Sequence, residues 1–159
     1  MQKSEENYEG MLDSSMHKPR LVAGIDPGKR MSGLVVACLD PVFGIQLAKR
    51  TKNPVVCDFL WRENFVLVCM EDFRIYPWAL KSMRWDELNE VRMIGAVEEI
   101  CRFAEIPLSH YQPSVTKSIS DKQLVALGTW SRNAHVNDAF RVLWCGVLRE
   151  NLRRTNGRR

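Results

Sequence analysis

Four residues that are far apart in the sequence have side chains suited to binding a metal ion. Asp26 follows the apolar run LVAGI, and Glu71 closes the apolar run FVLVCM. Asp138 follows His135 by three residues, a spacing that places both on one face of a helix. Each position alone also has an ordinary explanation, since Asp-Pro-Gly is a common turn sequence and a lone histidine is most often a surface or capping residue.

The chemistry that these side chains could support depends on whether they converge. Carboxylates that are brought together repel one another unless a cation neutralises them. Mg2+ is a hard cation that binds through a few carboxylates together with phosphate oxygens. Two such ions about 3.5–4 Å apart stabilise both the attacking and the leaving oxygen of a phosphoryl displacement. That chemistry needs no protein nucleophile, and the sequence contains no G-x-S-x-G nucleophile motif.

The strands that would carry these acids follow from the hydrophobic pattern. Five strands are expected, at 21–25, 32–40, 44–50, 65–71 and 108–112. The first three are separated by tight turns, which predicts an antiparallel meander. The fourth is a near-continuous apolar run, as in a central strand covered on both faces. Because adjacent side chains on a strand point to opposite sides, only one of Glu71 and Asp72 should face the site, and the strand-terminal position favours Glu71.

Helices are expected between and after these strands. They are predicted from Pro54 to 64, at 85–105, around 121–127 and from near Asn133 onward. A meander followed by alternating helices and strands predicts an α/β protein with a mixed five-stranded sheet and helices on both faces. Ligands of such sheets gather at strand ends, which is where Asp26 and Glu71 are expected.

Three short motifs resemble those of the RuvC-like branch of the ribonuclease H-like nucleases. They are GIDPG at 24–28, LVCMED around Glu71 and HVNDA at 135–139, in the family's order and over most of the chain. The resemblance implies a ribonuclease H-like fold and makes Asp26, Glu71 and Asp138 metal ligands. It makes His135 a further ligand or a group near the attacking water. The implied cofactor is Mg2+, with Mn2+ able to substitute.

Basic and aromatic residues near the acids are the expected nucleic-acid contacts. They are Lys29, Arg30, Phe73, Arg74, Lys117 and Lys122. The resemblance implies that the two lysines at 117 and 122 contact the DNA backbone and that Phe73 stacks at a junction. The others lie beside the acids, where phosphates would have to approach. The stretch FRIYPWALKSMRW has the composition of a base-stacking surface, but also that of a packed loop or a dimer contact.

The function that the resemblance implies is metal-dependent cleavage of branched DNA. We expect a structure-selective endodeoxyribonuclease of the Holliday junction resolvase type, a homodimer acting on four-way junctions and flaps. Its acidic arm and the unusual sequence after Glu71 indicate a divergent member, of a type that phages encode. Two alternatives remain open. GKRMSG also resembles the G-x-K-R-x-G of small bacterial pre-ribosomal-RNA nucleases, and the scaffold could serve as a non-catalytic nucleic-acid-binding module.

Length and composition indicate one globular domain. The 159 residues are 45% hydrophobic and 26% charged, and no apolar run is long enough to span a membrane. We expect a flexible acidic arm at 1–18, the nuclease domain at 19–150 and a basic tail at 151–159. The tail is either a footprint for a polyanion or a solvated helix end. Five cysteines without a C-x-x-C pair favour free thiols in a reducing cytoplasm. The resemblance implies the cytoplasm of a bacterium or of a phage-infected host.

Overall fold

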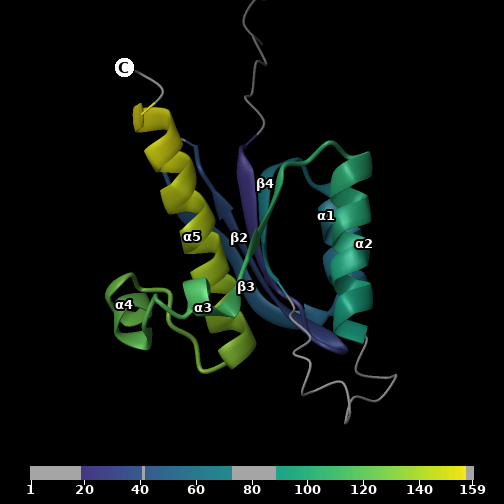
Figure 1. Cartoon of the computed structure of the whole chain (residues 1–159), viewed down its shortest axis with the longest axis horizontal. Helices are drawn as coiled ribbons and strands as arrows, with labels where there is room; N and C mark the ends of the chain where they lie inside the picture. The colour runs from purple at the N-terminus through teal and green to yellow at the C-terminus, as the bar shows by residue number, and fades with distance from the viewer. Residues whose placement is uncertain (1–18, 41, 73–88, 157–159) are drawn as a thin grey trace, which may run out of the picture.

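A mixed sheet of five strands, in the order β3-β2-β1-β4-β5, forms the centre of the protein (Figure 1). The computed structural model describes residues 19–40, 42–72 and 89–156, with side chains up to Arg149. The strands are β1 (Leu21–Asp26), β2 (Met31–Cys38), β3 (Gly44–Lys52), β4 (Phe65–Glu71) and β5 (Leu108–Tyr111). β1, β2 and β3 pair antiparallel, whereas β4 runs parallel to β1, and β5 parallel to β4. The expected meander and the two further strands are therefore confirmed.

Helices cover both faces of this sheet, as the pattern predicted. The helices are α1 (Asn53–Arg62), α2 (Asn89–Phe103), α3 (Pro113–Thr116), α4 (Asp121–Ala126) and α5 (Ala134–Asn156). Figure 1 shows α1 and α2 on one side and α5 on the other, with α3 and α4 beside the first half of α5. None of the described helices combines the length and hydrophobicity that a membrane span requires.

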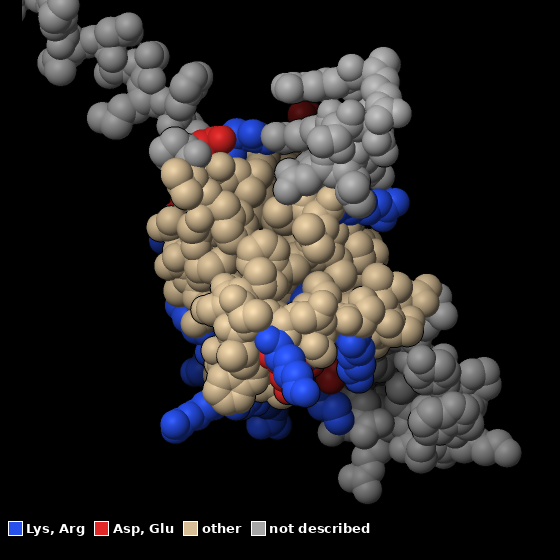
Figure 2. Space-filling view, turned by 90° about the vertical axis from the view of Figure 1, so that its left-hand side faces the viewer, with Lys and Arg blue, Asp and Glu red and all other residues tan. Residues whose placement is uncertain are grey.

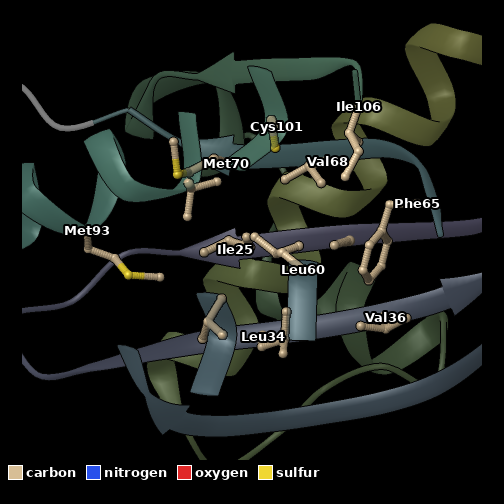
Figure 3. Close-up of a cluster of buried hydrophobic side chains, with 13 residues drawn as sticks. Ile25, Leu34, Val36, Leu60, Phe65, Val68, Met70, Met93, Cys101 and Ile106 are labelled. Atoms are coloured by element: carbon tan, nitrogen blue, oxygen red, sulfur yellow. The ribbon is translucent and has the colours of Figure 1, made fainter. Parts of the chain in front are cut away.

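Side-chain alternation divides the sheet into two cores. Ile25 on β1, Leu34 on β2 and Met70 on β4 face α1 and α2, where they are fully buried around Leu60 (Figure 3). The residues that alternate with these along the strands face α5, and they form a second cluster with residues of α4 and α5. Its buried members are Val22, Val35, Ala37, Leu124, Val136, Ala139, Phe140 and Leu143. Asp26 and Glu71 continue the series that faces α5, so the same alternation that builds the cores aims both acids at that helix.

Glycines in the sheet allow α5 to lie directly on the strands. A Cβ atom on Gly24 would lie 2.3 Å from the backbone oxygen of Ala139, and one on Gly33 would lie 1.9 Å from that of His135. Both distances are too short for a real side chain, so the strands and the helix meet through backbone. The first turn of α5 is thereby held against the ends of β1 and β2.

The element boundaries differ from the sequence-based expectations in a few places. The segment after β5, expected to be a loop before the next helix, contains the single-turn helix α3, which Pro113 opens at its first turn. α4 begins at a capping box, in which the Ser120 hydroxyl accepts from the Gln123 backbone N–H and the Gln123 side chain accepts from the Ser120 N–H. The backbone of α5 continues to Asn156, past the expected domain end at residue 150. Residues 85–88 of the expected helix 85–105, and the arm at 1–18, lie outside the described residues.

Candidate active site

Asp26 and His135 form the centre of the candidate site. The Asp26 Oδ2 lies 2.6 Å from the His135 Nδ1, at the point where the end of β1 meets the first turn of α5. The Asp26 side chain is only 13% exposed, whereas that of His135 is 40% exposed. Burial raises the pKa of Asp26 to about 6, although the hydrogen bond and the charge of His135 act in the opposite direction. The pair joins a nearly buried carboxyl group to an imidazole that is accessible to solvent.

Glu71 lies next to Asp26 because β4 runs parallel to β1. Ile25 pairs with Met70, so the residue that follows on each strand lies at the same edge. The two carboxyl groups are close enough for each to shift the pKa of the other. The Thr116 hydroxyl shares its proton between the Pro113 carbonyl oxygen, at 3.1 Å, and the Glu71 Oε1, at 3.4 Å. Burial, followed by the charges of Asp26 and of Asp138, raises the pKa of Glu71 to about 7, while Lys117 lowers it.

Asp138 is the third acid of the site, one turn along α5 from His135. Its charge raises the pKa of Asp26 and that of Glu71. Its Oδ1 accepts a hydrogen bond of 2.5 Å from the Nη1 of Arg141. All four residues that the sequence predicted as catalytic and metal-binding thus meet at one edge of the sheet.

The chemistry of this donor set fits a hard divalent cation. Three carboxylates and one imidazole supply mostly oxygen ligands, and the mutual repulsion of the acids is what a bound cation would relieve. As they stand, the side chains pair with one another and with Arg141. Within the described segments, no three His, Cys, Asp or Glu side chains are arranged so that they could already hold a metal ion.

Asp72 takes no part in this cluster. Its backbone N–H donates to the carbonyl of Tyr111 at the end of β5. Alternation along β4 directs Glu71 toward α5 and the side chain after it to the other side. The choice of Glu71 over Asp72 agrees with this geometry.

Basic side chains surround the acids. Lys29, Arg30 and Arg50 line a hollow of about 510 Å3 that also includes His135. Lys117 and Lys122 line a second hollow of about 480 Å3 on the α4 side. Figure 2 shows Lys and Arg side chains gathered at the lower end of the molecule, the end at which α5 begins. Two predicted contacts, Phe73 and Arg74, lie outside the described residues.

A hydrogen-bonded ring fixes the turn that carries Lys29 and Arg30. The Ser32 hydroxyl accepts from the Gly28 backbone N–H over 3.3 Å and donates to the Asn53 Oδ1 over 2.9 Å. The Asn53 Nδ2 donates in turn to the Gly28 carbonyl over 2.9 Å. The turn after Asp26 is therefore tied to the start of α1 and has a defined shape.

Sequence reasoning missed several residues of the site. They are Ser32, Arg50, Asn53, Thr116 and Arg141. Arg50 could have been found from the register of the meander, because it pairs with Gly33, which itself pairs with Asp26. The others interact with partners that only the three-dimensional packing brings near, and no local pattern marks them.

Comparison with known proteins identifies the fold. No family model matches the chain, and no curated protein matches its sequence. Among solved structures, RuvC of T. thermophilus in complex with a Holliday junction substrate superposes with a TM-score of 0.58 and 21% identity, covering 78% of this chain and 90% of that one. The fowlpox virus Holliday junction resolvase gives 0.52 and 10% identity, covering 77% and 93%. The yeast mitochondrial Holliday junction resolvase Ydc2 gives 0.50 and 16%, covering 82% and 79%.

These likenesses confirm the expected ribonuclease H-like fold, an α/β fold with a mixed five-stranded sheet. The chain shares this fold with RuvC and with the two other resolvases. The structural resemblance predicted from the three motifs is confirmed at this level.

Proposed function

We propose that this protein is a metal-dependent endonuclease that cuts branched DNA such as Holliday junctions. The observation that carries the proposal is the convergence of Asp26, Glu71, His135 and Asp138 at one edge of a sheet whose fold is shared with three resolvases. The acids from two strand ends and one helix supply negative charge that would hold metal ions. Metal-assisted hydrolysis of a phosphodiester needs no nucleophile from the protein.

Asp26, Glu71 and Asp138 would hold Mg2+, with Mn2+ as an alternative. When bound, the metal would polarise the scissile phosphate and make water a stronger nucleophile. The His135 Nδ1 is occupied by its bond to the Asp26 Oδ2. That bond orients the ring and leaves the Nε2 as the atom that accepts or returns a proton near the attacking water. Thr116 places its hydroxyl 3.4 Å from the Glu71 Oε1, with its proton shared with the Pro113 carbonyl oxygen.

The basic residues on both sides of the acids would hold the DNA backbone. Lys29, Arg30 and Arg50 line one hollow together with His135, and Lys117 and Lys122 line the other together with Arg141, which binds Asp138. Contacts to phosphates position a duplex without reading its sequence. This distribution favours selection by the shape of the DNA, as a nuclease for branched substrates needs.

A second copy of the chain is the proposed protein partner. Large apolar side chains are exposed on the two helices that cover the far face of the sheet, among them Trp61 on α1 and Phe103 on α2. A homodimer formed there would present two sites to one junction. The five cysteines are free, which suits a reducing compartment such as the cytoplasm.

The test uses purified protein and matched variants. Four-way, flap and linear DNA, together with structured RNA, are incubated with Mg2+ or with EDTA. Glu71→Gln should abolish cleavage while junction binding remains, because it removes a proposed ligand without removing a basic residue. Asp72→Asn changes the adjacent acid, which lies outside the cluster, and should cut like the wild type.

The outcomes separate the candidate functions. Cleavage in EDTA, or full activity in Glu71→Gln, would refute the metal-dependent mechanism. Cleavage of RNA alone would move the assignment to an RNA-processing nuclease. Tight junction binding without cleavage under any metal would identify a non-catalytic nucleic-acid-binding module.

A further inference from the structure

Arg141 contacts three separate parts of the protein at once. Its Nη1 donates to the Asp138 Oδ1 over 2.5 Å, and its Nε donates to the carbonyl oxygen of Ile119 over 2.8 Å. Its Nη2 donates to the Oδ1 of Asp121. The Arg141 side chain is only 13% exposed. The guanidinium is thus held on three sides and largely removed from water.

The partners of Arg141 lie at functionally different places. Asp138 belongs to the acid cluster, whereas Asp121 is the first residue of α4 and Ile119 lies in the connection between α3 and α4. That connection is bordered by Lys117 and Lys122, which line the same hollow as Arg141. Figure 1 shows α3 and α4 against the first half of α5, the part of the helix from which Arg141 extends.

We infer that Arg141 is a positioning residue that fixes the lysine-bearing segment 117–122 relative to Asp138. The inference rests on the proposed function, because it assigns the lysines to the DNA backbone and Asp138 to the metal. A phosphate bound by the lysines would then lie at a fixed distance from the acids, because α4 does not have to move when DNA binds.

The geometry requires an arginine rather than any positive charge. A guanidinium offers five N–H donors in a planar fork, so one side chain can bridge a helix, a loop carbonyl and a second helix. A lysine is a point charge on a flexible stem and cannot hold all three in the same arrangement. Exposed ion pairs contribute little to stability, but this one is mostly buried on the arginine side and includes a backbone acceptor.

Three variants separate bridging from charge. Arg141→Lys keeps the charge and removes the fork. Asp121→Asn weakens the α4 end of the bridge and leaves the Arg141–Asp138 bond intact. Arg102→Lys is the matched control, because Arg102 also pairs with an acid three residues earlier on a helix, Glu99, but is exposed and far from the site.

The first measurement is amide hydrogen exchange across residues 117–127, without DNA or metal. Loss of charge-assisted hydrogen bonds should speed exchange there about tenfold in Arg141→Lys and by a smaller factor in Asp121→Asn. The second is the affinity for a four-way junction in EDTA, which should fall about three- to tenfold in both variants. In cleavage assays Asp121→Asn should raise KM with kcat nearly unchanged, whereas Arg141→Lys should also lower kcat because Asp138 is no longer held.

Each result decides a specific point. If exchange and junction affinity in Arg141→Lys match those of the wild type and of Arg102→Lys, the inference is wrong. If exchange rises but KM and kcat do not change, Arg141 has a structural role only and the positioning role is refuted. If the wild type fails to cut any branched DNA while exchange still rises in Arg141→Lys, the proposed function fails and the bridge itself stands.

Discussion

Repulsion and burial of the acids should lower the free energy of unfolding of the metal-free protein. The Asp26→Asn variant should therefore be more stable than the wild type at neutral and basic pH. The Asp26 carboxylate is buried beside two further acids, and its pKa rises from 3.8 to about 6 in the folded chain. The folded protein therefore binds the Asp26 proton more tightly than the unfolded chain does. The stabilising effect of that proton is fully present below pH 3.8 and is lost as the pH rises through about 6.

The size of the effect follows from the same difference in proton affinity. Each tenfold difference between the folded and the unfolded chain is worth about 1.36 kcal/mol, so ionised Asp26 destabilises the fold by about 2–3 kcal/mol above pH 7. An asparagine has no charge to bury, and its amide can still accept a hydrogen bond from His135. For a chain of this length, the Asp26→Asn variant should melt about 4–10 °C above the wild type at pH 8.

The assay is thermal unfolding in EDTA at pH 4, 6 and 8, with Asp72→Asn as the control for simple loss of a charge. The advantage of Asp26→Asn should be largest at pH 8 and should shrink toward pH 4. Adding Mg2+ should then stabilise the wild type more than the variant, since a ligand that binds only the folded state raises its stability. Equal or lower stability of Asp26→Asn at pH 8, or a gain that does not depend on pH, would refute the reasoning.

Three further predictions concern the packing of α5 against the sheet and the basic residue Arg50. Gly33→Ala should lower the free energy of unfolding by about 3 kcal/mol, because the added Cβ would overlap the backbone oxygen of His135. Gly95→Ala, which adds a Cβ in open space on α2, should not lower it. If chemical denaturation gives the two variants the same stability, the close contact at Gly33 is contradicted. Leu143→Ala, fully buried between α5 and the sheet, should cost about 2–5 kcal/mol in the same assay, and a loss below 1 kcal/mol would mean that this core repacks. Arg50→Gln should weaken junction binding equally for all junction sequences and reduce the slope of log affinity against log salt by about 1; an unchanged slope would exclude a phosphate contact.

Much of the fold could be predicted because its elements have strong local signals. The apolar runs of β1, β2 and β4 end at turn residues, and the three- and four-residue apolar spacing of α2 distinguishes a helix from a strand. α3 was missed because a helix of one turn has no periodicity to detect, and Pro113 is as common in loops as at helix starts. The observed ends of strands and helices differ from the predicted ends by one to a few residues. Hydrogen bonds to neighbouring elements determine where each element ends, and the local sequence does not show them.

The acids of the site could be predicted because strand ends and helix starts are themselves visible in sequence. Asp26 and Glu71 are each the last residue of a strand, and the parallel pairing of β1 with β4 then brings them together. Arg141 could not be predicted. Its contacts with Ile119 and Asp121 span about twenty residues and depend on where α4 packs against α5. A single arginine on a helix has too many available partners for the sequence to select one.

The order of the site residues along the chain has a consequence for synthesis in the cell. β1 through β4 leave the ribosome before α5, since chains are made from the N-terminus at about 5–20 residues per second. Until α5 settles onto Gly24 and Gly33, Asp26 has neither His135 nor Asp138 beside it. A nascent chain therefore carries separated parts of the candidate site, and the four residues come together only after α5 has docked onto the sheet.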